Sequence, residues 1–249
     1  MQVLYGNRQE DGAFDSRGAS KHYAKLVDDS FQTYIFNLLV FYQVIGYAQQ
    51  DEIRRRSKLR PTDKDTNFTA KLCQNPLAES LKKNTQLTVA FGKARQGRSL
   101  DADLVRTLYL EYAKTETYQN YVYQQTESQE TDHIAVYLDL YKFLINNETF
   151  VSMMEDHFPL WKDDKSLVVG AMKKTLKALP MQETFLDAFL PQDETVKLFG
   201  EALLEKVVAS NQELLGIIEP NLKNWDADRV AILDMIILKM SLAEFLYFS

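Results

Sequence analysis

The stretch that decides the fold lies at the end of the chain, where residues 225–248 read WDADRVAILDMIILKMSLAEFLYF. Its apolar residues recur at steps of three and four, the spacing of an α-helical face. Further apolar residues widen the stripe beyond one face: Ile232, Leu238, Leu242 and Phe245. The few charges inside it are Asp234, Lys239 and Glu244. A helix this apolar is normally buried on most sides. We therefore predict a core helix over 225–248, capped by Asn224.

A second long helix is predicted nearer the start of the chain. Its apolar face consists of residues three or four positions apart: Phe31, Tyr34, Ile35, Leu38, Leu39, Tyr42 and Ile45. The pattern begins after Lys21 and runs into a charged segment that ends at Arg56. Nine Gly and six Pro are few for 249 residues, and a β-rich fold with many tight turns needs more of both. The sequence therefore predicts an all-α, multi-helix bundle.

Composition limits where this protein works. Its single cysteine, Cys73, excludes an intrachain disulfide and is typical of a cytoplasmic protein. No stretch approaches the roughly 18 apolar residues of a membrane span. Residues 1–12 lack the apolar core of a signal peptide. We therefore expect a cytoplasmic location and no membrane. The net charge of −6 argues mildly against a protein that depends on phosphate contacts, but it leaves room for a local basic patch.

The residue types that carry catalysis do not form a recognisable site. His22, His133 and His157 lack metal-ligand spacing, and we predict that each lies at the surface. Glycine motifs for nucleotides and the G-x-S-x-G motif of hydrolases are absent from the sequence. Cys73 has no neighbouring histidine, so it is expected to act as a small buried hydrophobe. The sequence therefore predicts a binding protein, not an enzyme, with no metal and no cofactor.

The densest basic run in the sequence lies between residues 54 and 60. It consists of Arg54, Arg55, Arg56, Lys58 and Arg60. Such a run could contact phosphates. It could equally be a solvated helix end, where bases favour the C-terminal dipole. The second interpretation is preferred because no aromatic residue is interleaved for base stacking.

The order of residues in the last helix resembles the NusB family of transcription antitermination factors. That family shows a Trp-x-x-x-Arg opening, an acid, an Ile-Leu-basic run and a Glu-Leu ending. The corresponding residues are Asn224-Trp225-Asp226-Ala227-Asp228-Arg229, then Asp234, Ile237-Leu238-Lys239 and Glu244-Phe245-Leu246. The block Leu198–Leu222 is similar to the preceding helix of the family, and Met1-Gln2-Val3-Leu4-Tyr5 is similar to its Val-Gln-x-Leu-Tyr motif.

The middle of the chain is similar to the long helical insertion of NusB proteins from the Bacteroidetes. The similar segments are Leu59-Arg60-Pro61-Thr62 and Trp161-Lys162-Asp163-Asp164. The resemblance implies two helical bundles, divided into residues 1–158 (the remnant of the first helix and the inserted helices) and residues 159–249 (an incomplete NusB-like C-terminal bundle).

The resemblance also implies partners. These are the ribosomal protein NusE, the boxA RNA element of ribosomal RNA leaders and the RNA polymerase antitermination complex. Gln2 and Tyr5 match positions that face RNA. Positions matching the partner side are Tyr5, Asp234, Lys239 and Glu244.

Two departures from the family concern RNA. The family has an Arg-rich stretch before its Val-Gln-x-Leu-Tyr motif and continues past Glu-Leu with further helices, whereas this sequence runs from Met1 to Ser249. We therefore expect a form truncated at both ends. The alternative function is a NusB-like helical scaffold for protein interactions that does not bind RNA.

Overall fold

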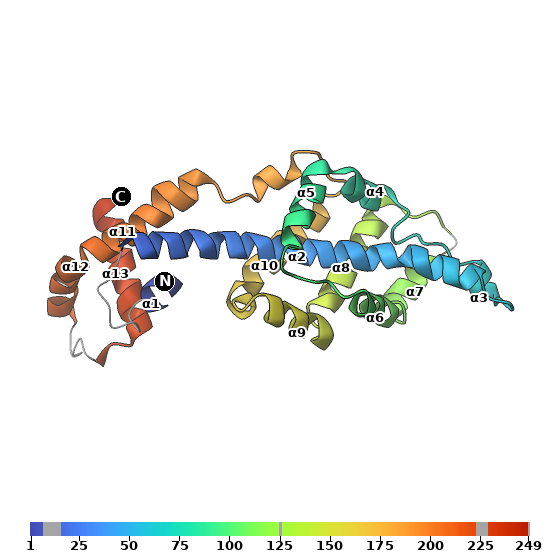
Figure 1. Cartoon of the computed structure of the whole chain (residues 1–249), viewed down its shortest axis with the longest axis horizontal. Helices are drawn as coiled ribbons and strands as arrows, with labels where there is room; N and C mark the ends of the chain where they lie inside the picture. The colour runs from blue at the N-terminus through green and yellow to red at the C-terminus, as the bar shows by residue number, and fades with distance from the viewer. Residues whose placement is uncertain (7–15, 125, 223–228, 249) are drawn as a thin grey trace. The chain divides into compact units, whose positions relative to one another are not determined.

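The structure is a computed structural model that describes residues 1–6, 16–124, 126–222 and 229–248. Every regular element in this part is a helix (Figure 1), which confirms the predicted all-α, multi-helix class. The chain forms two compact units. Unit 1 comprises Met1–Asp29 and Pro191–Ser249, and unit 2 comprises Ser30–Leu190. Within the described residues, no helix combines the length and the apolar character needed to cross a membrane.

Unit 2 is built around the long helix α2. Its elements are α2 (Ser16–Arg56, from residue 30 onward), α3 (Asp63–Thr66), α4 (Pro76–Lys83), α5 (Thr85–Ala94), α6 (Ala102–Tyr112), α7 (Glu116–Tyr123), α8 (Glu130–Leu144), α9 (Glu148–His157), α10 (Trp161–Lys177) and η1 (Phe185–Ala188). In Figure 1, α4 and α5 lie on one side of α2, and α6 and α9 lie on the other. The predicted apolar face from Tyr34 to Ile45 is buried in the core of this unit, which confirms the long helix near the start of the chain.

Side-chain caps define where most of the short helices of unit 2 begin. Asn75 accepts hydrogen bonds from the backbone N–H groups of Leu77 and Ala78, and Pro76 occupies the first helical position of α4. Asn84 and Asp101 cap α5 and α6 in the same way. Each cap satisfies amide groups that have no partner inside the helix. The starts of these helices are thus defined by local side chains.

Unit 1 is smaller. Its elements are α1 (Gln2–Gly6), the first residues of α2, the π-helix η2 (Glu194–Glu201), α11 (Ala202–Ala209), α12 (Asn211–Ile218), the 3-10 helix η3 (Glu219–Asn221) and α13 (Ile232–Tyr247). α13 packs against α1, α11 and α12. The core of the unit includes Val3 and Leu4 from α1, Leu204 and Val207 from α11, and Ile236 from α13. This core holds one side of α13 against the rest of unit 1.

The two compact units follow a different division from the one expected at residue 158. α10 packs against α8 and α9 and buries Trp161 in the core of unit 2. The first six residues pack instead with the end of the chain in unit 1. The boundary expected at residue 158 separates the inserted helices from the NusB-like C-terminal bundle. That assignment of segments stays a prediction.

Candidate functional site

The last helix is the feature that the sequence singled out, and the structure corrects two predictions about it. α13 begins at Ile232 with Ala231 at its N-cap position, not near residue 225. The predicted cap Asn224 and the residues from Trp225 to Asp228 lie outside the described residues. The helix is also not buried on most sides. It buries only Met235, Ile236 and Ala243 among its described residues, and α1, α11 and α12 pack against it.

The opposite side of α13 is an exposed surface that we call the α13 outer face. It consists of Leu233, Asp234, Ile237, Leu238, Ser241, Glu244 and Phe245. With about 3.6 residues per turn, these positions fall on adjacent lines along one side of the helix. Leu233 and Ile237 are each 47% exposed, and Leu238 is 40% exposed. Several large apolar side chains gathered on one exposed face are typical of a surface that binds another macromolecule.

Two of the four predicted partner-binding residues lie on the α13 outer face. Asp234 stands in the first turn of the helix, where an acid is favoured by the helix dipole, and Glu244 lies close to its end. Both side chains are exposed. Neither forms a salt bridge with another described residue. The face therefore combines an apolar centre with an acid toward each end.

Lys239, the third predicted position on this helix, lies on another side of it. Its side chain is partly buried, and Nζ donates a hydrogen bond of 2.6 Å to Oδ1 of Asn211, the first residue of α12. This bond joins α13 to α12 and gives Lys239 a role inside unit 1. It does not place Lys239 on the outer face with Asp234 and Glu244.

The predicted RNA-facing residues Gln2 and Tyr5 lie on the exposed side of α1. Val3 and Leu4 between them are buried in the unit 1 core, whereas Gln2 is exposed and Tyr5 is 39% exposed. The burial of α1 against α13 thus leaves both side chains accessible. The positions suit a contact surface, and the roles in RNA and partner binding stay predictions.

Four of the five bases in the run that begins at the end of α2 form internal ion pairs. Buried Asp51 pairs with Arg54 at 2.6 Å and with Arg55 at 2.8 Å. Glu52 pairs with Arg56 at 2.5 Å, and Asp65 pairs with Lys58 at 2.7 Å. The bond from Lys58, followed by those from Thr62, lowers the pKa of Asp65. These contacts agree with the preferred sequence interpretation, a helix end rather than a phosphate-binding run.

The histidines and the cysteine differ partly from their predictions. His22 is exposed as predicted. His133 is buried, which is a correction, and its Nδ1 lies 2.7 Å from the hydroxyl of Tyr121. His157 is partly buried and its ring lies edge-on to Phe36. Cys73 is partly buried, and burial raises the pKa of its thiol. Among the described residues, no group of three His, Cys, Asp or Glu side chains could hold a metal ion.

Buried His133 predicts a pH effect on stability. Burial, followed by the charge of Lys71, lowers the pKa of His133. The unfolded chain therefore takes up a proton near the ordinary histidine value, about 6.5, while the folded chain does not. Stability is present above that value and is lost as pH falls below it. We expect melting temperatures measured at about pH 7.5 and about pH 5.5 to differ less for His133→Asn than for the wild type. His22→Asn is the control and should match the wild type; equal pH dependence in all three proteins would exclude His133 as the cause.

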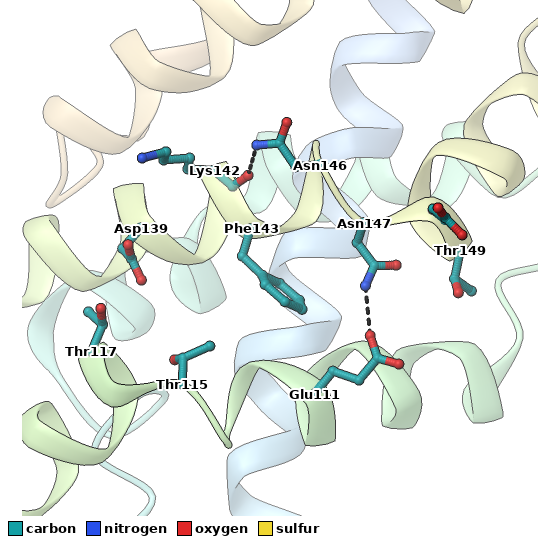
Figure 2. A pocket seen from close by; sticks show the side chains of 10 residues that line it. Glu111, Thr115, Thr117, Asp139, Lys142, Phe143, Asn146, Asn147 and Thr149 are labelled. Atoms are coloured by element: carbon teal, nitrogen blue, oxygen red, sulfur yellow. Dashed lines mark hydrogen bonds between the residues drawn. The ribbon is translucent and has the colours of Figure 1, made fainter.

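The pocket in Figure 2 lies between α6, α7, α8 and the start of α9 and measures about 560 Å³. Two of its amides already have partners, because Asn147 donates to the carboxylate of Glu111 at 2.7 Å and Asn146 donates to the carbonyl of Lys142 at 2.7 Å. Acidic residues outnumber basic ones among its described lining residues. It therefore does not suit phosphate.

Comparison with known proteins relates the chain to antitermination factors. The proteins named transcription antitermination protein NusB of Listeria monocytogenes, Listeria welshimeri and Listeria innocua are each 35% identical to it over 82 residues. The matched segment is 31% of this chain and 64% of each relative, so the chain spans less than two thirds of the length of these relatives. No family model matches the sequence, and no solved structure matches the fold. The identity and the all-α fold together support a NusB-like relationship.

Proposed function

We propose that this chain is a NusB-type transcription antitermination factor that binds the ribosomal protein NusE through the α13 outer face and binds boxA RNA of ribosomal RNA leaders. The single observation that carries the proposal is the 35% identity to proteins of that name. The function is one of binding, without catalysis. In the proposed assembly, the complex of the two proteins and RNA acts on RNA polymerase during transcription.

The α13 outer face supports the protein half of the proposal. Its apolar side chains provide area that a partner can bury, and Asp234 and Glu244 suit basic side chains on that partner. Both acids come from the positions that the family resemblance assigned to the partner side. The exposed Tyr5 and Gln2 on α1 are proposed as further contacts, Tyr5 to either NusE or RNA and Gln2 to RNA.

Reversing the charge of Asp234 tests this surface. We expect Asp234→Lys to weaken binding to the cognate NusE by about tenfold, mainly through slower association, because a rim charge steers the encounter. Surface plasmon resonance at low and at moderate salt measures this, and the effect should shrink as salt rises.

Glu213→Lys is the matched control for this measurement. Glu213 is an exposed acid in the first turn of α12, so the two substitutions carry the same charge change and the same cost at a helix N-terminus. An affinity that falls equally in both variants would remove Asp234 from the interface and leave only a general charge effect.

RNA titration separates the proposed factor from a scaffold that does not bind RNA. Specific phosphate contacts predict that the affinity for boxA RNA falls steeply as salt rises. Binding to boxA that exceeds binding to a scrambled RNA of equal length supports the factor. Equal, weak binding to both RNAs, with NusE binding intact, would favour the scaffold.

A further inference from the structure

A groove in unit 2 has a lining that no part of the proposed function uses. It lies between α2, α4 and the segment that follows α5, and it measures about 1160 Å³. Tyr42, Gln43 and Tyr47 line it from α2. The charged residues of its lining are three bases and one acid: Lys82, Arg95, Arg98 and Glu79. A space of this size exceeds that of a site for one small molecule and suits an extended ligand.

The chain that forms the far side of the groove is strongly basic. Between Ser80 and Leu100 the sequence holds Lys82, Lys83, Lys93, Arg95 and Arg98, and neither Asp nor Glu. The protein as a whole carries a net charge of −6. This segment therefore concentrates positive charge against the average of the chain, which is the charge pattern of a local anion-binding surface.

Most of these bases have no acidic partner, unlike those at the end of α2. Glu79, the one acid of the groove lining, pairs with Lys83 at 3.3 Å, and both side chains are well exposed. The guanidinium of Arg98 lies 4.5 Å from the centre of the Phe158 ring. Lys82 and Arg95 form no salt bridge with any described residue. The charge of Lys82 and Arg95 is thus available to an anion in the groove.

The α2 side of the groove offers rings and amides. Tyr42 and Tyr47 are partly exposed, and each packs against another ring: Phe91 lies 5.6 Å from Tyr42 and Tyr109 lies 5.1 Å from Tyr47, between centroids. Gln43 adds an amide to the same lining. Fixed aromatic rings stack on bases, amides pair with base edges, and lysine and arginine contact phosphates.

We propose that this groove binds a single strand of RNA, with Lys82 and Arg95 on the phosphates and Tyr42 and Tyr47 against the bases. An acidic peptide would use the bases of the groove but not its rings and amides. A duplex keeps its bases stacked out of reach of the rings. The inference deepens the proposed function, on which the choice of RNA over DNA rests, and it adds a second surface to the Gln2 and Tyr5 positions of unit 1.

The test uses the full chain and a fluorescein-labelled single-stranded RNA of about 12 nucleotides, the site size of one stacking groove. Fluorescence anisotropy at several salt concentrations gives Kd and its salt slope. We expect the double variant Lys82→Gln/Arg95→Gln to raise Kd about tenfold and to reduce the slope of log K against log salt by about 1.4, since each phosphate contact on a single strand contributes about 0.7.

The matched control is Lys114→Gln/Lys173→Gln. Lys114 and Lys173 are exposed bases of unit 2 outside the lining of the groove, so the net charge changes equally. We expect Kd to change less than about twofold in this control, with unchanged melting temperatures in both double variants.

Four outcomes overturn the inference, and they are distinguishable. An equal loss of RNA affinity in both double variants would exclude the groove as the RNA-binding site without contradicting the proposed function. A wild-type chain that binds NusE but no RNA removes the RNA half of both proposals. If polyglutamate displaces the labelled RNA as well as unlabelled RNA does, the groove is a site for acidic peptides. Equal affinity for duplex RNA excludes stacking on Tyr42 and Tyr47.

Discussion

Replacing Asp51 with Asn is expected to lower the free energy of unfolding of unit 2 by about 3 kcal/mol. The Asp51 side chain is completely buried. It accepts hydrogen bonds from Arg54 and Arg55, and from the hydroxyl of Tyr109 at 3.3 Å. Removing its charge leaves the partly buried guanidinium of Arg55 without its nearest partner, and the Asn amide brings donors toward a group that only donates. Chemical denaturation and calorimetry measure the change, about 6 to 12 °C in melting temperature.

Asp156→Asn is the control for this substitution. Asp156 is an exposed residue of α9, and its replacement should change the unfolding free energy by less than about 0.5 kcal/mol. The same small effect for Asp51→Asn would show that the network at the end of α2 contributes little, and that its arginines are available for other partners.

Removing apolar area from the α13 outer face is expected to have the largest effect on partner binding. The double variant Ile237→Ser/Leu238→Ser should weaken the complex with NusE by about 2 kcal/mol, roughly 30-fold in Kd, because the complex would otherwise bury these two side chains. Unit 1 should still fold, because Ile237 and Leu238 lie outside its buried core and are already 47% and 40% exposed. Isothermal titration calorimetry measures the affinity, and circular dichroism measures the fold.

Leu198→Ser/Ile217→Ser provides the matched comparison. Leu198 of η2 and Ile217 of α12 are exposed apolar residues of the same unit that lie on other helices. The same loss of apolar surface should leave the affinity within about twofold of the wild type. A 30-fold loss in this control, or none in the α13 variant, would move the interface away from the outer face.

Much of the fold follows from the sequence because its signals are local. The apolar spacing from Tyr34 to Ile45 predicts the buried side of α2, and that side is the centre of the unit 2 core. Asp101 is a cap that the sequence indicates by residue type alone. The buried position of His133 was not predictable in this way, because its partner Tyr121 is brought to it by the packing of α7 on α8.

The last helix shows where periodicity fails. Its apolar residues cover nearly the whole circumference, and this pattern predicts burial on most sides. The described neighbours α1, α11 and α12 cover one side only, and no local rule states which tertiary neighbours are present. The positions of Asp234 and Glu244 carried the missing signal, because both acids fall on the side that the structure leaves exposed.

For locating an anion-binding surface, the number of basic residues in a segment is less informative than whether acidic residues pair with them. The run from Arg54 to Lys58 looks more basic than the segment from Ser80 to Leu100, yet Asp51 and Glu52 precede it at the three- and four-residue spacing of helical ion pairs. The second segment has no acid within it. Only Lys82 and Lys83 in the second segment follow an acid, Glu79, at this spacing. Counting such acids would have identified the second segment from the sequence as the better candidate for binding an anion.

The central claim is that this chain is a NusB-type partner of NusE, and calorimetric titration of the full chain with the cognate NusE tests it most directly. We expect a one-to-one complex with a Kd of about 1 μM or tighter and a negative heat-capacity change, because the apolar side chains of the α13 outer face become buried. No measurable heat at concentrations of about 100 μM, with a chain that is folded by circular dichroism, would contradict it.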